Sequence, residues 1–198
     1  MGLLRNLLAL IGLAVVAAIV WVGVKLGPDI GALANLRDFD RQALATYGEL
    51  ATRLIATGNS AEATVWKVKV DEGLSAAEVE EVMRFVANEH NIKNVGELPL
   101  YKEVSAIQGS PYRFLQIYMF CNPMTAARMV DYSDAFSAYL PCRIALVEDK
   151  TGQLWLYTLN MDLMIHGGRE LPAELKEEAL SVKEIMLDIM NRAATGEF

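Results

Sequence analysis

An uncharged apolar run near the N-terminus constrains this chain more than any other feature. Residues 6–24 contain no charged residue, and Arg5 and Lys25 flank the run. A helix rises about 1.5 Å per residue, so a segment of this length crosses a hydrocarbon core of roughly 30 Å. Trp21 lies near one end of the run, where an aromatic ring would meet the lipid headgroups. We therefore expect residues 1–26 to form a transmembrane anchor.

A cleaved signal peptide is the alternative interpretation of this run. Signal peptides have a shorter apolar stretch followed by a small-x-small cleavage site, and no convincing A-x-A follows this run. Arg5 and the short N-terminal tail favour an N-terminus in the cytoplasm. Lys25, Arg37 and Arg41, on the other side of the run, argue for the reverse. We expect a single-pass protein of a bacterial-type inner (cytoplasmic) membrane, with its soluble domain in the periplasm.

The rest of the chain has the size and polarity of one folded domain. Residues 27–59 are expected to form a tether, beginning at Gly27-Pro28, and a juxtamembrane amphipathic helix; residues 60–198 are expected to form a globular α+β domain. The net charge of −7 and the lack of a Lys/Arg cluster exclude a general nucleic-acid-binding role. Two cysteines, Cys121 and Cys142, are too few for a disulfide framework.

Apolar spacing predicts the elements of this domain. The expected helices cover residues 38–56 and begin at Ser75, Pro123 and Pro172. The expected strands cover residues 64–70, 101–107, 113–121, 142–148 and 154–160. Helices alternate with strand pairs, which favours an α+β fold: a two-layer sandwich of a mostly antiparallel sheet with helices packed on one face.

The two strands that flank the third helix carry finer expectations. Strands 113–121 and 142–148 are joined through that helix, so they could lie parallel through a right-handed crossover. That topology would place Cys121 and Cys142 at opposite edges of the sheet, too far apart for a disulfide. The side chains expected to face the helices are Leu115, Ile117 and Met119, together with Trp66 and Val68.

Four motifs in the second half of the chain carry a family resemblance. They are CNP at 121–123, LPCR at 140–143, VED at 147–149 and NMDLMIHGG at 160–168. With them, residues of about 60–195 resemble the domain-of-unknown-function 302 family. The resemblance implies a compact α+β domain that is often dimeric, and the family's name says that no activity is established for it.

A soft-metal site is the chemistry that these motifs suggest. A hairpin across the turn at 149–152 that pairs Leu146 with Trp155 and Cys142 with Leu159 would bring Cys142 close to the 160–168 motif. Thiol and thioether donors suit copper as Cu(I). The candidate ligands are Cys142, His166, Met161 and Met164. The alternative is structural: methionines that fill the core, a buried cysteine and a histidine that holds a turn.

Two functions from different classes remain open. The first is a membrane-anchored accessory or interaction domain, a subunit or helper of a larger membrane assembly or a homo-oligomer held in the membrane by residues 6–24. Small residues at Gly12, Ala14, Ala18 and Gly23 would permit close packing of the anchor against another helix. The second is a small-ligand, copper or redox carrier. The sequence contains no GxSxG, HExxH, P-loop or GxGxxG motif, so no catalytic residues are assigned.

Overall fold

The structure is a computed structural model that describes residues 2–26 and 30–198. The chain divides into two compact units, Met1–Phe39 and Asp40–Phe198. The predicted end of the anchor at Gly27-Pro28 lies outside the described residues.

The first unit contains the apolar helix. Helix α1 covers Gly2–Leu26, and a 3-10 helix, η1, covers Ile30–Asp38. Within α1, Leu4–Val24 has a mean hydropathy of 2.8 and is long and apolar enough to cross a membrane. A signal sequence near an N-terminus has the same two properties.

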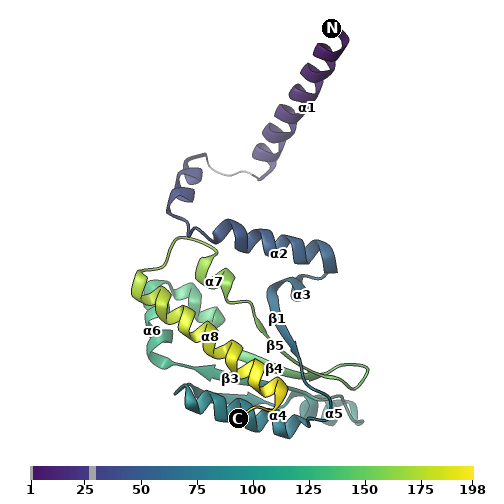
Figure 1. The fold of residues 1–198 in the computed structure, drawn as a ribbon, viewed down its shortest axis with the longest axis vertical. Coiled ribbons are helices and arrows are strands. Elements are labelled where there is room, and N and C mark those ends of the chain that lie inside the picture. The colour runs from purple at the N-terminus through teal and green to yellow at the C-terminus, as the bar shows by residue number, and fades with distance from the viewer. Residues whose placement is uncertain (1, 27–29) are drawn as a thin grey trace. The chain divides into compact units, whose positions relative to one another are not determined.

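The second unit is an α+β sandwich, which confirms the predicted fold class (Figure 1). Its strands are β1 (Val65–Lys69), β2 (Lys93–Leu98), β3 (Leu115–Cys121), β4 (Cys142–Glu148) and β5 (Leu154–Leu159). Its helices are α2 (Ala43–Thr57), α3 (Ser60–Thr64), α4 (Ala76–Glu89), α5 (Leu100–Gln108), α6 (Pro123–Tyr132), η2 (Asp134–Tyr139), α7 (Asp162–His166) and α8 (Ala173–Thr195). All neighbouring strands are antiparallel, in the order β1-β5-β4-β3-β2. Helices α4 and α8 lie side by side over one face (Figure 1).

Local signals in the sequence set the starts of two helices that cover the sheet. Ser75 and Glu78 form a reciprocal capping box at the start of α4. The side chain of Asn122 accepts hydrogen bonds from the backbone N–H groups of Met124 and Thr125, and Pro123 occupies the first turn of α6. Both predicted helix starts are confirmed.

The predicted parallel crossover between the third and fourth strands is wrong. Strands β3 and β4 are antiparallel neighbours, and Phe120 pairs with Cys142. Helix α6 and η2 pack against each other, so the chain returns to the end of the sheet from which it left. Cys121 and Cys142 therefore lie at the same end of the sheet, and the separation predicted for them from a parallel crossover is wrong.

The predicted inner face of β3 is also wrong. The buried side chains of this strand are Gln116, Tyr118 and Phe120. The half-buried set on the other face is Leu115, Ile117 and Met119. Apolar residues occupy both faces, so alternation alone could not choose between them. The polar groups of the buried set have partners, because Gln116 binds Glu97 and Tyr118 donates a hydrogen bond to Glu80. Trp66 and Val68 do pack against the core, as expected.

The hairpin register differs from the prediction by one residue. Leu146 pairs with Leu156, and Glu148 pairs with Leu154. Gln153 is left out of the pairing because it belongs to the turn, where its N–H donates to the Asp149 carboxylate. The Gln153 side chain instead donates to the backbone oxygen of Val70.

The segment between α4 and β3 was predicted least well. Residues 101–107 were expected to be extended, but they belong to α5. The fifth strand is β2, which lies at an edge of the sheet and is mostly exposed. An exposed edge strand has no apolar alternation, so this pattern could not have identified it.

Candidate functional site

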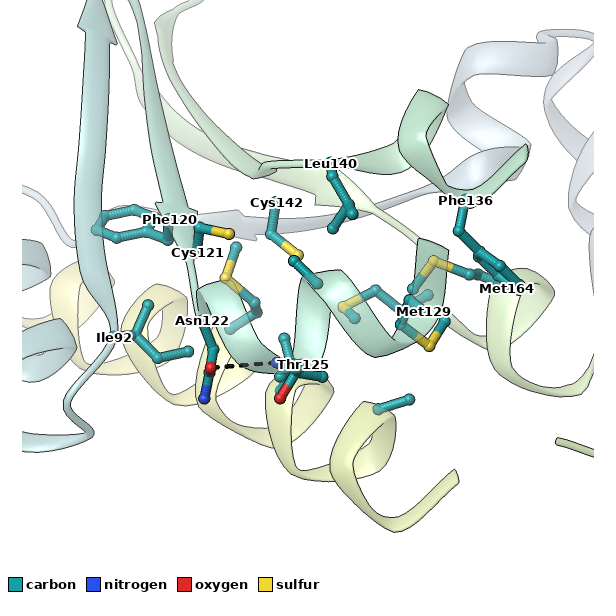
Figure 2. A pocket seen from close by; sticks show the side chains of 15 residues that line it. Ile92, Phe120, Cys121, Asn122, Thr125, Met129, Phe136, Leu140, Cys142 and Met164 are labelled. Carbon is teal, nitrogen blue, oxygen red and sulfur yellow. Dashed lines mark hydrogen bonds between the residues drawn. The ribbon is translucent and has the colours of Figure 1, made fainter. Parts of the chain in front are cut away.

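A small, partly enclosed pocket lies between the end of the sheet and the helix layer, and six of its fifteen lining side chains contain sulfur. Its free volume is about 30 Å³, enough for a water-sized ligand or one metal ion. We call it the sulfur pocket, after the six sulfur-containing side chains that line it: Cys121, Met129, Cys142, Met161, Met164 and Met186. Figure 2 shows Cys121 and Cys142 on neighbouring strands, with Met129 and Met164 on the helices opposite.

The local sequence explains how the two cysteines meet. Cys121 is the last residue of β3 and Cys142 is the first residue of β4. Phe120 pairs with Cys142, so the backbone of Cys121, the next residue along β3, lies beside that of Cys142. Asn122 then caps α6 (Figure 2), and this helix brings the buried Met129 to the lining of the pocket. The pocket is thus a product of one strand pairing and one helix cap.

Both cysteines are free thiols held in their protonated form. Burial, with the nearby Cys121 adding to it, raises the pKa of Cys142 to about 11. Burial also raises the pKa of Cys121 above its usual value. A thiol is a weak nucleophile and a weak ligand until it loses its proton. At neutral pH the pair is therefore mostly protonated, and a soft metal ion would have to displace these protons to bind.

Two further hollows adjoin the sulfur pocket. One of about 20 Å³ shares Cys142, Met161 and Met164 with it and adds Arg143 and Asn160. An open groove of about 300 Å³ shares Phe136 and Met164 with it. Met164 therefore lies where all three hollows meet, at the boundary between the buried thiols and the protein surface.

The structure brings together three of the four predicted ligands. Cys142, Met161 and Met164 all line the sulfur pocket, and His166 does not. Instead, His166 Nδ1 lies 3.1 Å from Asp40 Oδ2. Among residues 2–26 and 30–198, no three His, Cys, Asp or Glu side chains form a metal-binding group. Besides the oxygen-bearing side chains of Asn122 and Thr125, the donors that line the pocket are thiols and thioethers, which are soft ligands.

His166 belongs to a second buried group, which we call the charged cluster: Asp40, His166 and Lys176. The side chains of Asp40 and His166 are 1% and 3% exposed. Lys176 Nζ lies 2.6 Å from Asp40 Oδ2, and the backbone N–H of Gln42 donates to Asp40 Oδ1 at 2.8 Å. Burial acts to raise the pKa of Asp40, but the hydrogen bonds from Lys176, Gln42 and His166 outweigh it and lower the pKa to about 2. Asp40 is therefore ionised and fully paired.

Sequence reasoning missed three donors of the sulfur pocket. Cys121 was considered only as a disulfide partner, and Met129 and Met186 were not among the candidate ligands. Met129 and Met186 lie on α6 and α8 and are buried, so their spacing predicts only that they face the core. Their approach to Cys142 depends on the antiparallel pairing of β3 and β4, and the available local pattern did not reveal that pairing.

The fold and the site together define a small α+β domain with a sulfur-lined pocket. The family model described as "Domain of unknown function DUF302" matches residues 66–193. The chain therefore belongs to the DUF302 family. No curated protein matches it. A solved structure with the same architecture is the crystal structure of an uncharacterized conserved DUF302 protein from Bacillus stearothermophilus. It is 16% identical to this chain, with a TM-score of 0.53 over 66% of this chain and 98% of the other.

Proposed function

We propose that this protein is a membrane-anchored carrier of a soft metal ion, Cu(I), which it holds in the sulfur pocket. The observation that carries the proposal is the meeting of two thiols and four thioethers in one almost wholly apolar pocket. Helix α1 would anchor the chain in the inner membrane, with the domain on the periplasmic side. Its length and apolar composition support the anchor.

The chemistry of the pocket favours Cu(I) over harder ions. Thiolates and thioethers select soft metals, whereas Mg²⁺ and Ca²⁺ require oxygen ligands. Two thiolates would neutralise one monovalent ion and leave a net charge of −1. Cys121 and Cys142 would be the main ligands, and Met164 would be a weaker third ligand at the mouth of the pocket. Binding would release the two thiol protons.

Competition with a chromophoric Cu(I) chelator, using the full chain in lipid nanodiscs without oxygen, tests this proposal. The wild type should bind one Cu(I) per chain. Cys142→Ser should lower the affinity by about 100-fold or more, because it removes a thiolate ligand. Met83→Leu is the matched control, since Met83 is buried in the core but does not line the pocket. Equal affinities of the wild type and the Cys121→Ser/Cys142→Ser double variant, both folded by circular dichroism, would refute metal binding at this pocket.

The role of accessory subunit in a membrane assembly is the second candidate, and the open face of the sheet favours it. The side chains of Leu115, Ile117 and Met119 are only half-buried there. An apolar surface of this kind is typical of an interaction site. Mild extraction from native membranes, followed by mass measurement, tests this role. A larger complex is expected, and free monomer alone would contradict it.

A further inference from the structure

We infer that α2 lies in the membrane interface and inserts one apolar stripe into the lipid. This inference rests on the membrane anchor proposed above. The stripe consists of Leu44, Gly48, Ala51 and Ile55, and we call it the α2 stripe. These positions follow the helical repeat i, i+4, i+7, i+11, so they line one face over about 16 Å of helix. Leu44 is 85% exposed and Ile55 is 84% exposed.

The remainder of the domain is already packed against a different face of α2. Ala43 is buried, and Thr46, Leu50 and Arg53 are half-buried on that side. Tyr47 lies at the edge of the stripe, and its hydroxyl donates a hydrogen bond to the backbone oxygen of Gly167, the residue that follows α7. The tertiary contacts therefore hold the helix in place with the α2 stripe facing away from the core.

The composition of the stripe fits a lipid surface. It contains no charged or hydrogen-bonding side chain, and Arg53 and Glu49 pair with each other outside it, with 2.7 Å between Arg53 Nη2 and Glu49 Oε1. Tyr47 at its edge presents an amphipathic ring, which is the type of side chain enriched at headgroup level. An interfacial helix with one apolar face binds in this way, its apolar side chains buried at the boundary between headgroups and acyl chains.

A lipid surface fits the stripe better than a second copy of the chain. Helix α1 ends at Leu26 and α2 begins at Ala43, so the connection reaches at most about 60 Å even when fully extended. The anchor therefore keeps α2 at a high effective concentration next to the bilayer. A stable dimer buries roughly 800 Å² per partner through about 20–30 residues. The four residues of one narrow stripe are far fewer than that.

Photocrosslinking of the full chain in vesicles of phosphatidylcholine and phosphatidylglycerol tests this inference. Benzoylphenylalanine replaces Leu44 or Ile55 and, as a matched control, Ile107. Ile107 is 87% exposed, and it lies on α5, at the other end of the domain from α2 (Figure 1). After illumination, mass spectrometry of the digested chain should show lipid adducts at positions 44 and 55, at a level about fivefold or more above position 107.

Each other result would overturn the inference in a distinct way. A crosslinked dimer at position 55 would assign the stripe to a second copy. Equal lipid labelling at positions 55 and 107 in chains that float with the vesicles would show that the stripe faces water while the anchor holds. Chains that do not float with the vesicles would refute the anchor, and with it the placement of α2. Cu(I) binding by the sulfur pocket is measured separately and would stand in all three cases.

Discussion

The sulfur pocket and the charged cluster lie in one domain, and they differ in whether their ionisable groups already have hydrogen-bonding or charged partners. The short helix α7 contributes to both, because Met164 lines the sulfur pocket and His166 contacts Asp40. Residues two apart on a helix point about 200° away from each other. Met161 lies three residues before Met164 and therefore shares its side. The helix thus separates the histidine from the two methionines that precede it in the sequence.

The difference shows which group is free to take a ligand. The Asp40 carboxylate has three hydrogen-bond donors and a lowered pKa, so it is stable without a further partner. The two thiols are protonated, because burial raises the pKa of each. A protonated thiol is neutral and can be buried without a charged partner, whereas a buried thiolate would require a cation. The charged cluster therefore ties Asp40 to α7 and α8, and the sulfur pocket offers unused ligands.

The largest effect that would separate the two groups is the pH dependence of Cu(I) affinity. The pKa of Cys142 is about 11, so both thiols are protonated near neutral pH and each must lose a proton to bind. The affinity should therefore rise with pH by up to about 100-fold per unit. Competition titrations at pH 6, 7 and 8 measure the slope, and Asp40→Asn should share it. A flat profile would show that the thiols are not the ligands.

Removal of the charge of Asp40 should have the next largest effect, and on stability rather than binding. Asp40→Asn leaves the largely buried Lys176 and His166 without their anion, which should lower the free energy of unfolding by about 3 kcal/mol. Glu170→Gln is the matched control, because Glu170 pairs with the same lysine but is 58% exposed. That change should cost less than about 1 kcal/mol. Urea unfolding followed by circular dichroism measures both, and equal costs would show that the charged cluster stabilises the fold no more than the exposed Lys176–Glu170 pair does.

Much of the fold could be predicted because its signals are local. The capping box at Ser75, the Asn122-Pro123 helix start and the strands on either side of the turn at 149–152 are all local patterns, and the structure contains each of them. Edge strand β2 lacked such a signal, since it is mostly exposed. Residues 101–107 are helical, and Leu100, Val104 and Ile107 have the spacing that would have indicated it.

The candidate site was predicted only in part, because it depends on contacts between distant segments. Cys142, Met161 and Met164 were grouped together, and they do line one pocket. Cys121 was separated from them by a wrong choice of strand direction, and the structure pairs β3 and β4 antiparallel instead. His166 was included because it is near in sequence, but its partner Asp40 is 126 residues away. Such long-range pairs leave no pattern in a single sequence.

A smaller effect should appear in acid, and it sharpens the assignment of Asp40. Its pKa is lowered from 3.8 to about 2 in the folded state, so the unfolded chain takes up the proton first as pH falls. The stabilisation is therefore complete above pH about 4 and is lost as pH falls from there to about 2, for a total of about 1–2 kcal/mol after allowance for solvent screening. The difference in unfolding free energy between wild type and Asp40→Asn should shrink over this interval, and a constant difference would assign the loss to other carboxylates.

The smallest predicted effect concerns Met164, the residue at the boundary of the sulfur pocket. Met164→Leu keeps the volume and the apolar character but removes the thioether, so it should cost less than about 1.5 kcal/mol of stability. If Met164 is the weaker third ligand, the Cu(I) affinity should fall about tenfold, which corresponds to 1.4 kcal/mol. His166→Gln should leave the affinity unchanged, because its ring contacts Asp40 and does not line the pocket. The same chelator competition measures both variants. A loss of Cu(I) affinity with His166→Gln and none with Met164→Leu would show that His166, and not Met164, is the ligand that α7 contributes.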